Sequence, residues 1–389
     1  MPRLNRDLWF FYASLLLFSV ANGAYMVSLP AYARELGASP VELGVLGSVG
    51  MAFSTVAALP GGWLADRFDR KLLMVIGWAM CIPVPLIFAA AQTWQQLIPG
   101  YALFHLSLFS NPAMQAYIAS KADPGKAGFT FSFVFSSLAV GAIAAPPLGG
   151  WLAETVGLDI VFYISAVVYF LSTAAILFMS KDKPATLEGR GAVTIRSVLT
   201  PQLVRHLLLF MLVMTVVHIP FSFITPYMQE VAGYDLARIG LLTSAAALGR
   251  MVISPFYGRV ADRRGTLPAI SYILLAVAAA YGMMIGTSWL PIFVLSFFLR
   301  GSSDGLNSLM ASEIGRISSR AAAGMSFALF GLCTNLGSTV APYLGGQLYA
   351  LAARWPFALA AALALLLSAY FIWNQSRQVR SMQSRQLAE

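Results

Sequence analysis

The chain has 389 residues, of which 58% are hydrophobic and only 11% charged, and its mean hydropathy is +0.73. Soluble domains carry about 25% charged residues, so the composition excludes a chain whose surface faces water alone. The formal charge of +9 would suit a nucleic-acid-binding protein only if the basic residues clustered on one surface.

Continuous apolar runs bounded by charge, Pro and Gly recur along the chain and are long enough to cross a bilayer. In chain order they predict helices over 8–29, 41–65, 72–91, 97–119, 128–153 and 158–180, then 206–228, 239–261, 267–288, 290–314, 321–350 and 355–374. The first run resembles a signal peptide, but it is long enough to span and many similar runs follow it. Because the runs do not alternate, they predict an all-α membrane protein with twelve transmembrane helices.

Lys and Arg are distributed unevenly between the predicted sides of the membrane. With both termini cytoplasmic, 20 of the 25 basic residues fall in cytoplasmic segments, and the external loops hold only Arg34, Arg238 and Arg354. This bias explains the positive charge and removes nucleic acid as a partner. We expect a multi-pass protein of a bacterial-type inner (plasma) membrane, with six-helix bundles at 1–180 and 206–376, a cytoplasmic linker at 181–205 and a cytoplasmic tail at 377–389.

The two halves match at a constant offset of 196 residues. The offset aligns Gly62 with Gly258, Asp66 with Asp262, Arg67 with Arg263, Asn111 with Asn307, Gly141 with Gly337 and Pro146 with Pro342. Six spans separate equivalent positions, so the halves have the same orientation and form a parallel repeat. Such halves can rock around a shared site.

The loop after the second predicted helix reads GWLADRFDRK from Gly62 to Lys71. It resembles the G-x-L-A-D-R-x-G-R-K signature of the major facilitator superfamily, and a weaker copy, GRVADRRG, starts at Gly258. The resemblance covers essentially the whole chain and implies the major facilitator fold in two pseudo-symmetric halves. It also implies that this loop latches the cytoplasmic side in the outward-open state.

Individual roles in the two loops follow from the chemistry of their residues. Gly62 would let neighbouring helices approach, Asp66 can face the N-terminal end of an adjacent helix, and Arg67 can pair with a carboxylate. Asp123 is the candidate partner for the first loop, and Glu313 for the second loop with Asp262 and Arg263. A basic turn that merely obeys the topology is the alternative. Asp69 stands where the signature has Gly, which leaves the turn geometry open.

The fifth predicted helix contains GAIAAPPLGG from Gly141 to Gly150, which resembles the antiporter signature G-x-x-x-G-P-x-x-G-G with Ala145 for the second Gly. Small residues at this spacing allow close helix packing, and Pro146 would bend the helix at a hinge. Gly337 and Pro342 repeat the pattern in the eleventh helix. The resemblance favours export or exchange, and small-residue packing without bearing on direction is the alternative.

Two arginines lie inside predicted spans, where a charge costs about 2.5–3.5 kcal/mol. Arg250 lies 12 residues before Asp262, about 18 Å along a helix and so near the midplane. On a continuous tenth helix Arg300, Asp304 and Asn307 share one face. Arg300 and Asp304 either neutralise each other or act in substrate binding or proton coupling.

Other polar side chains fall on the first, fourth, seventh and tenth helices, which by the resemblance line the central cavity. The candidates for solute binding or coupling are Asn22, Tyr25, Asn111, Gln115, His218, Ser222, Arg250, Arg300, Asp304 and Asn307. His218 is either a neutral hydrogen-bonded side chain or a proton carrier. Tyr25, which aligns with Phe221, is either an aromatic cavity wall or ordinary packing, and His105 is expected to be packed.

We therefore expect a secondary transporter similar to the drug and small-solute proton antiporters of this superfamily. It would export a small amphipathic or anionic solute by alternating access, with uptake or facilitated exchange of an organic anion as the alternative. Drug-proton antiporters carry an acidic residue in the first helix and an Arg in the fourth, both absent here, so Asp304 is the best candidate for proton coupling. The expected partners are a small-molecule solute, protons and membrane lipid.

Other classes of protein fit the sequence less well. An enzyme is not expected, because neither HExxH nor GxxxxGK[ST] occurs. A scaffold without transport conflicts with the costly charges inside spans. Cys81 and Cys333 lie in apolar segments without a CxxC, so no metal site is expected. No cofactor is expected either, and we expect the chain to act as a monomer.

Overall fold

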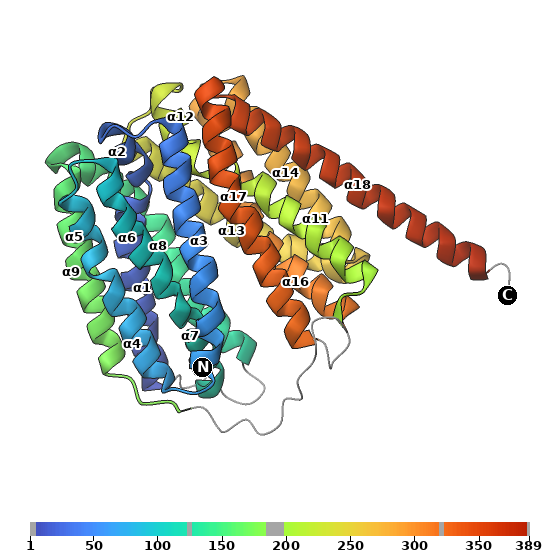
Figure 1. Ribbon diagram of the computed structural model, residues 1–389, viewed down its shortest axis with the longest axis horizontal. Helices are drawn as coiled ribbons and strands as arrows, with labels where there is room; N and C mark the ends of the chain where they lie inside the picture. Colours follow the sequence, from blue (N-terminus) through green and yellow to red (C-terminus); the bar gives the residue numbers. More distant parts are fainter. Residues whose placement is uncertain (1–4, 123–126, 184–197, 319–322, 387–389) are drawn as a thin grey trace. The chain divides into compact units, whose positions relative to one another are not determined.

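The computed structural model describes residues 5–122, 127–183, 198–318 and 323–386, and its regular elements over these ranges are all helices. Ten helical stretches within these ranges are long and apolar enough to cross a membrane. The two further predicted spans, 97–119 and 290–314, are also helical, but each is interrupted by a short 3-10 segment. The chain is therefore an all-α membrane protein with twelve spans, as predicted (Figure 1).

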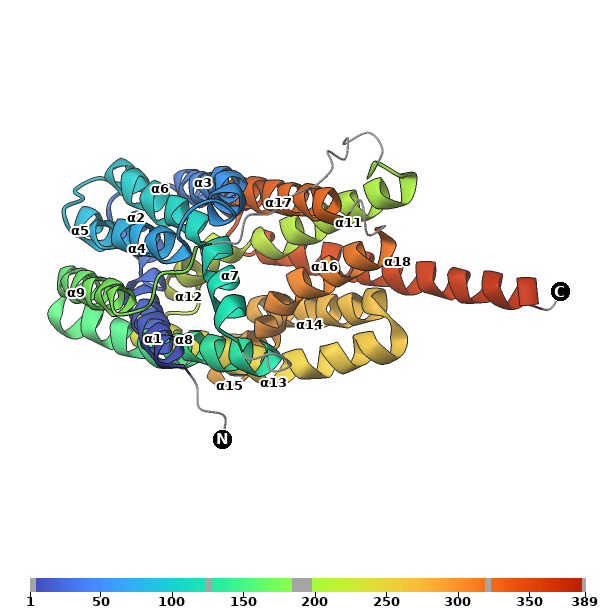
Figure 2. The same ribbon diagram turned by 90° about the horizontal axis from the view of Figure 1, so that it is seen from below.

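The chain divides into two compact units, and unit 1 comprises residues 1–191 and 222–244. Its helices are α1 (Arg6–Met26), α2 (Leu29–Glu35), α3 (Pro40–Ala65), α4 (Arg70–Cys81), α5 (Pro83–Ala89), η1 (Trp94–Leu97), α6 (Ile98–Ser107), η2 (Leu108–Ser110), α7 (Asn111–Lys121), α8 (Ala127–Val156), α9 (Leu158–Leu177) and α12 (Ile224–Glu230). Within it α1 packs along α8 and α9, side by side in Figure 2, and α2 contacts α12.

Unit 2 comprises residues 192–221 and 245–389. Its helices are α11 (Pro201–His218), α14 (Thr266–Gly286), α15 (Leu290–Arg300), η4 (Gly301–Gly305), α16 (Leu306–Ile317), α17 (Ala323–Leu351) and α18 (Trp355–Gln386). Here α14 packs on α18 and α15, and α11 packs on α17. Two elements cross the boundary between the units, η3 (Phe221–Phe223) and α13 (Leu236–Arg264).

The units do not follow the predicted bundles in one respect, because residues 222–244 of the second half group with the first half. The bundles at 1–180 and 206–376 stay a prediction. Helix α11 begins at Pro201, five residues before the predicted start, so the last part of the predicted linker is helical. The middle of that linker, with Arg190 and Arg196, lies outside the described residues.

Local sequence signals start several of these helices. Ser39 and Glu42 form a reciprocal capping box at the start of α3, with Pro40 in the first turn. Thr200 accepts from the Leu203 N–H at 3.2 Å and is followed by Pro201, which together begin α11. Each cap satisfies a backbone donor that the first turn of a helix leaves without an intrahelical partner.

The repeat seen in the sequence recurs in the helix starts. Helices α3 and α13 begin at Pro40 and Leu236, and α4 and α14 begin at Arg70 and Thr266. Both pairs are 196 residues apart, the offset found in the sequence. Equivalent sequence positions therefore occupy equivalent positions in the order of elements.

Apolar side chains fill the interior of each unit and also cover the outside. Phe11, Trp78 and Tyr117 are among the buried side chains that join α1, α4 and α7 in unit 1. Phe170 and Leu366 are 58% and 66% exposed, although both are strongly apolar. In water such exposure would be unfavourable, whereas hydrocarbon accepts it, which accounts for the high hydropathy of the chain.

Candidate functional site

Breaks occur in all four helices that were predicted to line a cavity. The first is interrupted at 27–28 between α1 and α2, and the seventh at η3 between α11 and α12. The fourth and tenth are interrupted by η2 and η4. Interrupted helices expose backbone groups inside a membrane and commonly mark binding sites in transporters of repeated architecture.

An ion pair of unit 2 lies at the break in the tenth span. Arg250 Nη1 of α13 lies 2.9 Å from Asp304 Oδ2 of η4, and the two side chains are 40% and 53% exposed. Helix α13 is continuous from Leu236 to Arg264, so Arg250 is about 18 Å along the helix from Asp262 at 1.5 Å per residue. A charged pair therefore lies deep in the span without being enclosed by the protein around it.

Arg300 does not occupy the place that the sequence suggested. Because α15 ends at Arg300 and η4 follows, Arg300, Asp304 and Asn307 do not lie on one continuous α-helix. Asp304 pairs with Arg250, and the Arg300 guanidinium instead lies 5.3 Å from the centroid of the Phe297 ring. Arg300 Nε is buried without a hydrogen-bond partner among the described residues. Arg300 thus retains hydrogen-bonding capacity at the break.

His218 is the last residue of α11, where the seventh span is interrupted. Its Nδ1 lies 2.9 Å from the Met214 carbonyl oxygen, so this nitrogen carries a proton and donates. Ser338 Oγ of α17 lies 3.5 Å from the same nitrogen. In the neutral tautomer this leaves Nε2 as an acceptor, which suits either a hydrogen-bonding or a proton-accepting role.

Tyr25 is packed inside unit 1, which favours the packing alternative over that of a cavity wall. The side chain is completely buried in unit 1, with its hydroxyl 3.3 Å from that of Tyr169 and its ring against Phe88 and Phe162. Asn22 also meets Tyr169, whose hydroxyl donates to Oδ1 at 3.4 Å. Phe221, the equivalent of Tyr25 in the repeat, is 52% exposed. The sequence could not separate the two because both are aromatic and share one helical register.

The remaining predicted polar residues are placed as follows. Asn111 begins α7 and is partly exposed, Gln115 one turn later is exposed, and Asn307 is exposed at the start of α16. Ser222 is 9% exposed in η3. His105 is held against α3 by a 2.7 Å hydrogen bond between its Nδ1 and Ser54 Oγ, as expected of a packed side chain.

The first signature loop is built differently from the expectation. A Cβ on Gly62 would meet nothing within 4 Å, whereas one on Gly61 would collide with the Phe109 carbonyl, so the close helix approach occurs at Gly61. The Arg67 guanidinium lies 4.4 Å from the Trp63 ring centroid, and Asp66 caps the end of α3. Asp123 lies outside the described residues.

Asp69, where the signature has Gly, starts the next helix. Its φ is −57°, so no glycine conformation is needed, and its carboxylate accepts from the Lys71 N–H at 2.9 Å. The residue thus caps α4. The cap was recognisable in the sequence, since Asp directly before a helix is a common N-cap.

The second signature loop does not engage Glu313. Glu313 is completely buried on α16 and accepts from the Thr266 hydroxyl and from Arg316 Nε, the latter at 3.0 Å. His206 Nε2 lies 3.7 Å from the same carboxylate. Gly258 shows no close approach, and Asp262 and Arg263 are exposed at the end of α13. The expected pairing of Glu313 with the Asp262–Arg263 loop is therefore corrected to a pairing with its own helix and α14.

The small residues of α8 bring other helices close. Gly141 lies against Ser19 of α1, and added Cβ atoms on Gly150 and Gly240 would collide with backbone of α13 and α8 respectively. Pro146 and Pro147 lie inside α8, which continues through both. Because Pro147 has no N–H, the Ile143 carbonyl four residues earlier loses its intrahelical donor, and Ser244 Oγ of α13 donates to it at 2.6 Å.

The equivalent pattern in α17 packs against α11. A Cβ on Gly337 would collide with the Met211 carbonyl, and Thr215 Oγ1 lies 3.3 Å from the Gly337 carbonyl oxygen. Pro342 lies inside α17, as Pro146 does inside α8. The packing role of both patterns is thus visible within each unit.

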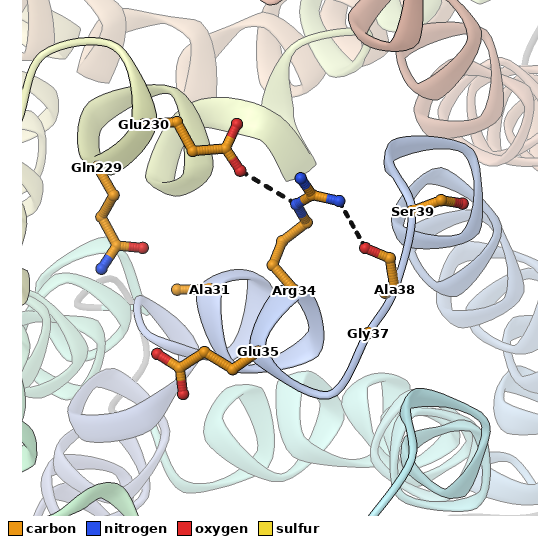
Figure 3. Close-up of a pocket in the computed structure, with 8 residues that line it drawn as sticks. All are labelled: Ala31, Arg34, Glu35, Gly37, Ala38, Ser39, Gln229 and Glu230. Carbon is orange, nitrogen blue, oxygen red and sulfur yellow. Dashed lines mark hydrogen bonds and ion pairs between the residues drawn. The ribbon is translucent and has the colours of Figure 1, made fainter.

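Sequence reasoning missed an ion pair between Arg34 of α2 and Glu230 of α12, 3.1 Å apart (Figure 3). The pair borders a shallow pocket of about 400 Å³ that Glu35 and Gln229 also line. The available signal was opposite charge at positions 196 residues apart. Over the ranges that the structure describes, no three His, Cys, Asp or Glu side chains gather as metal ligands.

Comparison with known proteins places this arrangement in context. The profile of the Major Facilitator Superfamily matches residues 11–263 and 207–381. The chain is 26% identical over 389 residues to multidrug resistance protein MdtG of Dickeya zeae (strain Ech586), covering 96% of this chain and 95% of that protein. It is 28% identical over 394 residues to MdtG of Escherichia coli (strain 55989 / EAEC), covering 97% and 96%. The fold is similar to a solved mutant of the nucleoside transporter NupG, with a TM-score of 0.82, 13% identity and coverage of 95% and 99%.

Proposed function

Because the chain belongs to the major facilitator superfamily and is a transporter of small molecules, we propose that it exports a small amphipathic or anionic solute in exchange for protons. The proposed site is the break in the tenth span, with Arg250, Arg300, Asp304 and His218 as its charged and titratable groups. The proposed location is a bacterial inner membrane, with both termini cytoplasmic and the chain acting as a monomer. Export is supported by the names of the curated relatives, multidrug resistance proteins.

The observation that carries the proposal is the exposed ion pair between Arg250 and Asp304, with Arg300 beside it on the chain. A charge facing hydrocarbon at this depth costs about 2.5–3.5 kcal/mol. The side chains of Arg250 and Asp304 are 40% and 53% exposed, so they would face hydrocarbon unless water or solute surrounds the pair. Two arginines against one carboxylate give the site an excess positive charge. That excess favours an anionic or zwitterionic solute.

Asp304 is proposed to couple solute to protons. While Asp304 is ionised it holds Arg250 at 2.9 Å, and protonation would release the Arg250 guanidinium. A released guanidinium could bind the solute carboxylate or phosphate, since charge-assisted hydrogen bonds are the strong ones. A purely anionic solute would then bind together with the proton and move in the same direction, which is the uptake alternative. Exchange follows when the solute also carries a cationic group, because that group and the proton compete for the Asp304 carboxylate.

Transport by purified protein in liposomes tests the site, with a panel of anionic, zwitterionic and neutral amphipathic solutes and with or without an imposed pH gradient. Arg300→Gln should lower the flux of anions about 10- to 100-fold, the equivalent of one charge-assisted hydrogen bond of about 1.5–3 kcal/mol. Arg205→Gln, which removes an exposed charge of α11 thirteen residues before His218, is the matched control and should leave flux unchanged.

Asp304→Asn tests the coupling separately. We expect solute flux to persist but to lose its response to the pH gradient. The site is refuted if Arg250→Gln and Arg300→Gln leave the transport of every accepted anion unchanged in normally inserted protein. Flux driven inward by the gradient instead of outward would replace export by uptake or exchange of an organic anion.

A further inference from the structure

We propose that Tyr169 of α9 is a positioning residue for solute recognition. It holds the Asn22 amide of α1 so that the amide N–H groups, and not the amide oxygen, are presented to the solute. The inference rests on the proposed function, since it assumes that a solute is bound, and it adds which kind of hydrogen-bonding group the solute must offer. The residues that do the positioning all belong to unit 1.

The Tyr169 hydroxyl joins two side chains of α1. It donates to Asn22 Oδ1 at 3.4 Å and lies 3.3 Å from the Tyr25 hydroxyl. Both tyrosine side chains are completely buried, with the Tyr169 ring against Phe18 and the Tyr25 ring against Phe88. The core of unit 1 therefore fixes the position of the donor that meets Asn22.

The hydrogen bonds of the two tyrosines decide which way the Asn22 amide points. A tyrosine hydroxyl has one proton, and Tyr169 gives it to Asn22 Oδ1, so Tyr25 donates to Tyr169. If the amide were reversed, Asn22 Nδ2 would donate to Tyr169, and Tyr169 would donate to Tyr25. The Tyr25 proton would then have no acceptor among the described residues, at a site that water does not reach. A buried donor without a partner is costly, so the first arrangement is the stable one.

This arrangement leaves the N–H groups of Asn22 for the solute. Asn22 is partly exposed and lies one turn before the break between α1 and α2. Its Nδ2 is neither bonded to a described residue nor among the buried polar atoms without a partner, so it is accessible. Donors that faced hydrocarbon within a span would be unfavourable. An acceptor of the solute, such as a carbonyl, ether or phosphate oxygen, would satisfy them.

The equivalent position in the second half has the opposite polarity. At the offset of 196 residues the two tyrosines become Phe221 and Leu365, and the asparagine becomes His218. There the backbone sets the polarity, because His218 Nδ1 donates to the Met214 carbonyl at 2.9 Å. A neutral His218 offers an acceptor, Nε2, where Asn22 offers donors. The two halves thus favour different groups, which suits a solute that carries both an acceptor and a donor, such as a zwitterion.

Nuclear magnetic resonance tests the orientation of the amide without any solute. The chain contains six asparagines, so protein labelled at asparagine gives few side-chain amide signals, and Asn22→Ala identifies that of Asn22. We expect the Nδ2 protons of Asn22 to exchange with water within about ten-fold of the rate for the exposed Asn307. Tyr169→Phe should shift the Asn22 signal. Tyr25→Phe removes an equally buried hydroxyl but keeps the donor to Asn22, so it should shift the signal much less.

Transport kinetics in liposomes test the consequence for recognition. For each anionic or zwitterionic solute of the panel that the unmodified protein moves, Tyr169→Phe should raise KM about three- to ten-fold and leave kcat within about two-fold. Tyr25→Phe is the matched control and should leave both unchanged. Asn22→Ala should raise KM at least as much as Tyr169→Phe, and combining the two should have no further effect. A tyrosine that only stabilised the helices would instead have the same effect in both backgrounds.

The inference is overturned if the Nδ2 protons of Asn22 are protected from exchange by about 100-fold or more, or if Tyr169→Phe leaves the Asn22 signal in place. It is also overturned if Tyr169→Phe raises KM as much in the Asn22→Ala background as in the unmodified protein. If the unmodified protein moves no solute while the amide signals respond as expected, the orientation of Asn22 stands and the transport proposal fails. If solute is moved with a KM that neither Tyr169→Phe nor Asn22→Ala changes, the role in recognition fails alone.

Discussion

The contact between Ser244 and the Ile143 carbonyl predicts a strong dependence of one substitution on another. Ser244→Ala removes the hydroxyl that donates to this carbonyl at 2.6 Å. Pro147 cannot replace it, since it has no N–H, and Ser244 is only 8% exposed, so water has little access. We expect the free energy of unfolding to fall by about 1–3 kcal/mol, the cost of a buried group left without a partner. Unfolding by SDS titration in mixed micelles measures it.

Pro147→Ala supplies the decisive background, because it restores a backbone N–H four residues after Ile143. In this background Ser244→Ala should lower the free energy of unfolding by about 0.5 kcal/mol or less. The two substitutions should therefore be coupled by about 1 kcal/mol. Ser137→Ala is the control: its buried hydroxyl donates to the Val134 carbonyl at 2.6 Å within α8, and no proline follows four residues later. Equal costs of Ser244→Ala in both backgrounds would refute the account of the orphaned carbonyl.

Three further substitutions test other assignments by the same titration. Asp69→Ala should lower the free energy of unfolding by about 0.5–2 kcal/mol through loss of the α4 cap, and Asp69→Asn, which can still cap, by much less; equal losses would contradict capping. Glu313→Gln should cost about 1–3 kcal/mol because the carboxylate is completely buried, whereas Arg316→Ala, with a side chain 65% exposed, should cost less than about 1 kcal/mol. Tyr25→Phe should cost about 0.5–1.5 kcal/mol by removing the hydroxyl that meets Tyr169, and should leave the KM for solute in liposomes unchanged; a raised KM would return Tyr25 to the binding site.

The spans and the repeat were predictable because they depend on local sequence. An apolar run of about 20 residues has few alternatives to a membrane helix, and the predicted starts of α4 and α14 were two residues or fewer from those observed. The breaks at η2 and η4 were not predicted. Both fall within apolar or small-residue sequence, where hydropathy does not distinguish a 3-10 turn from an α-helix.

Partners across helices were harder to predict than helices. Asp304 was expected beside Arg300, four residues away, because an α-helix brings such positions together. The 3-10 segment changes that register, and Arg250 of another helix takes the place. Glu313 was likewise assigned to a loop and found on Arg316, three residues along its own helix. Which side chains of different helices pair depends on how the helices pack, and the spacing of residues in one sequence does not give that packing.

The Arg34–Glu230 pair shows what the sequence repeat can and cannot predict about contacts between helices. If the two halves were identical, a charged residue that contacts its equivalent in the other half would meet a residue of the same charge. An attractive contact between equivalent positions therefore requires the two halves to differ there. A search for opposite charges at the offset of 196 finds Arg34 with Glu230 and also Glu42 with Arg238. The second combination is not a contact, because Glu42 is used in the capping box with Ser39 and Arg238 pairs with Asp235. Both partners lie three residues away in the sequence, so these local pairs could be recognised from it. Once charges with such local partners are set aside, Arg34 and Glu230 are the pair that can join the two repeats.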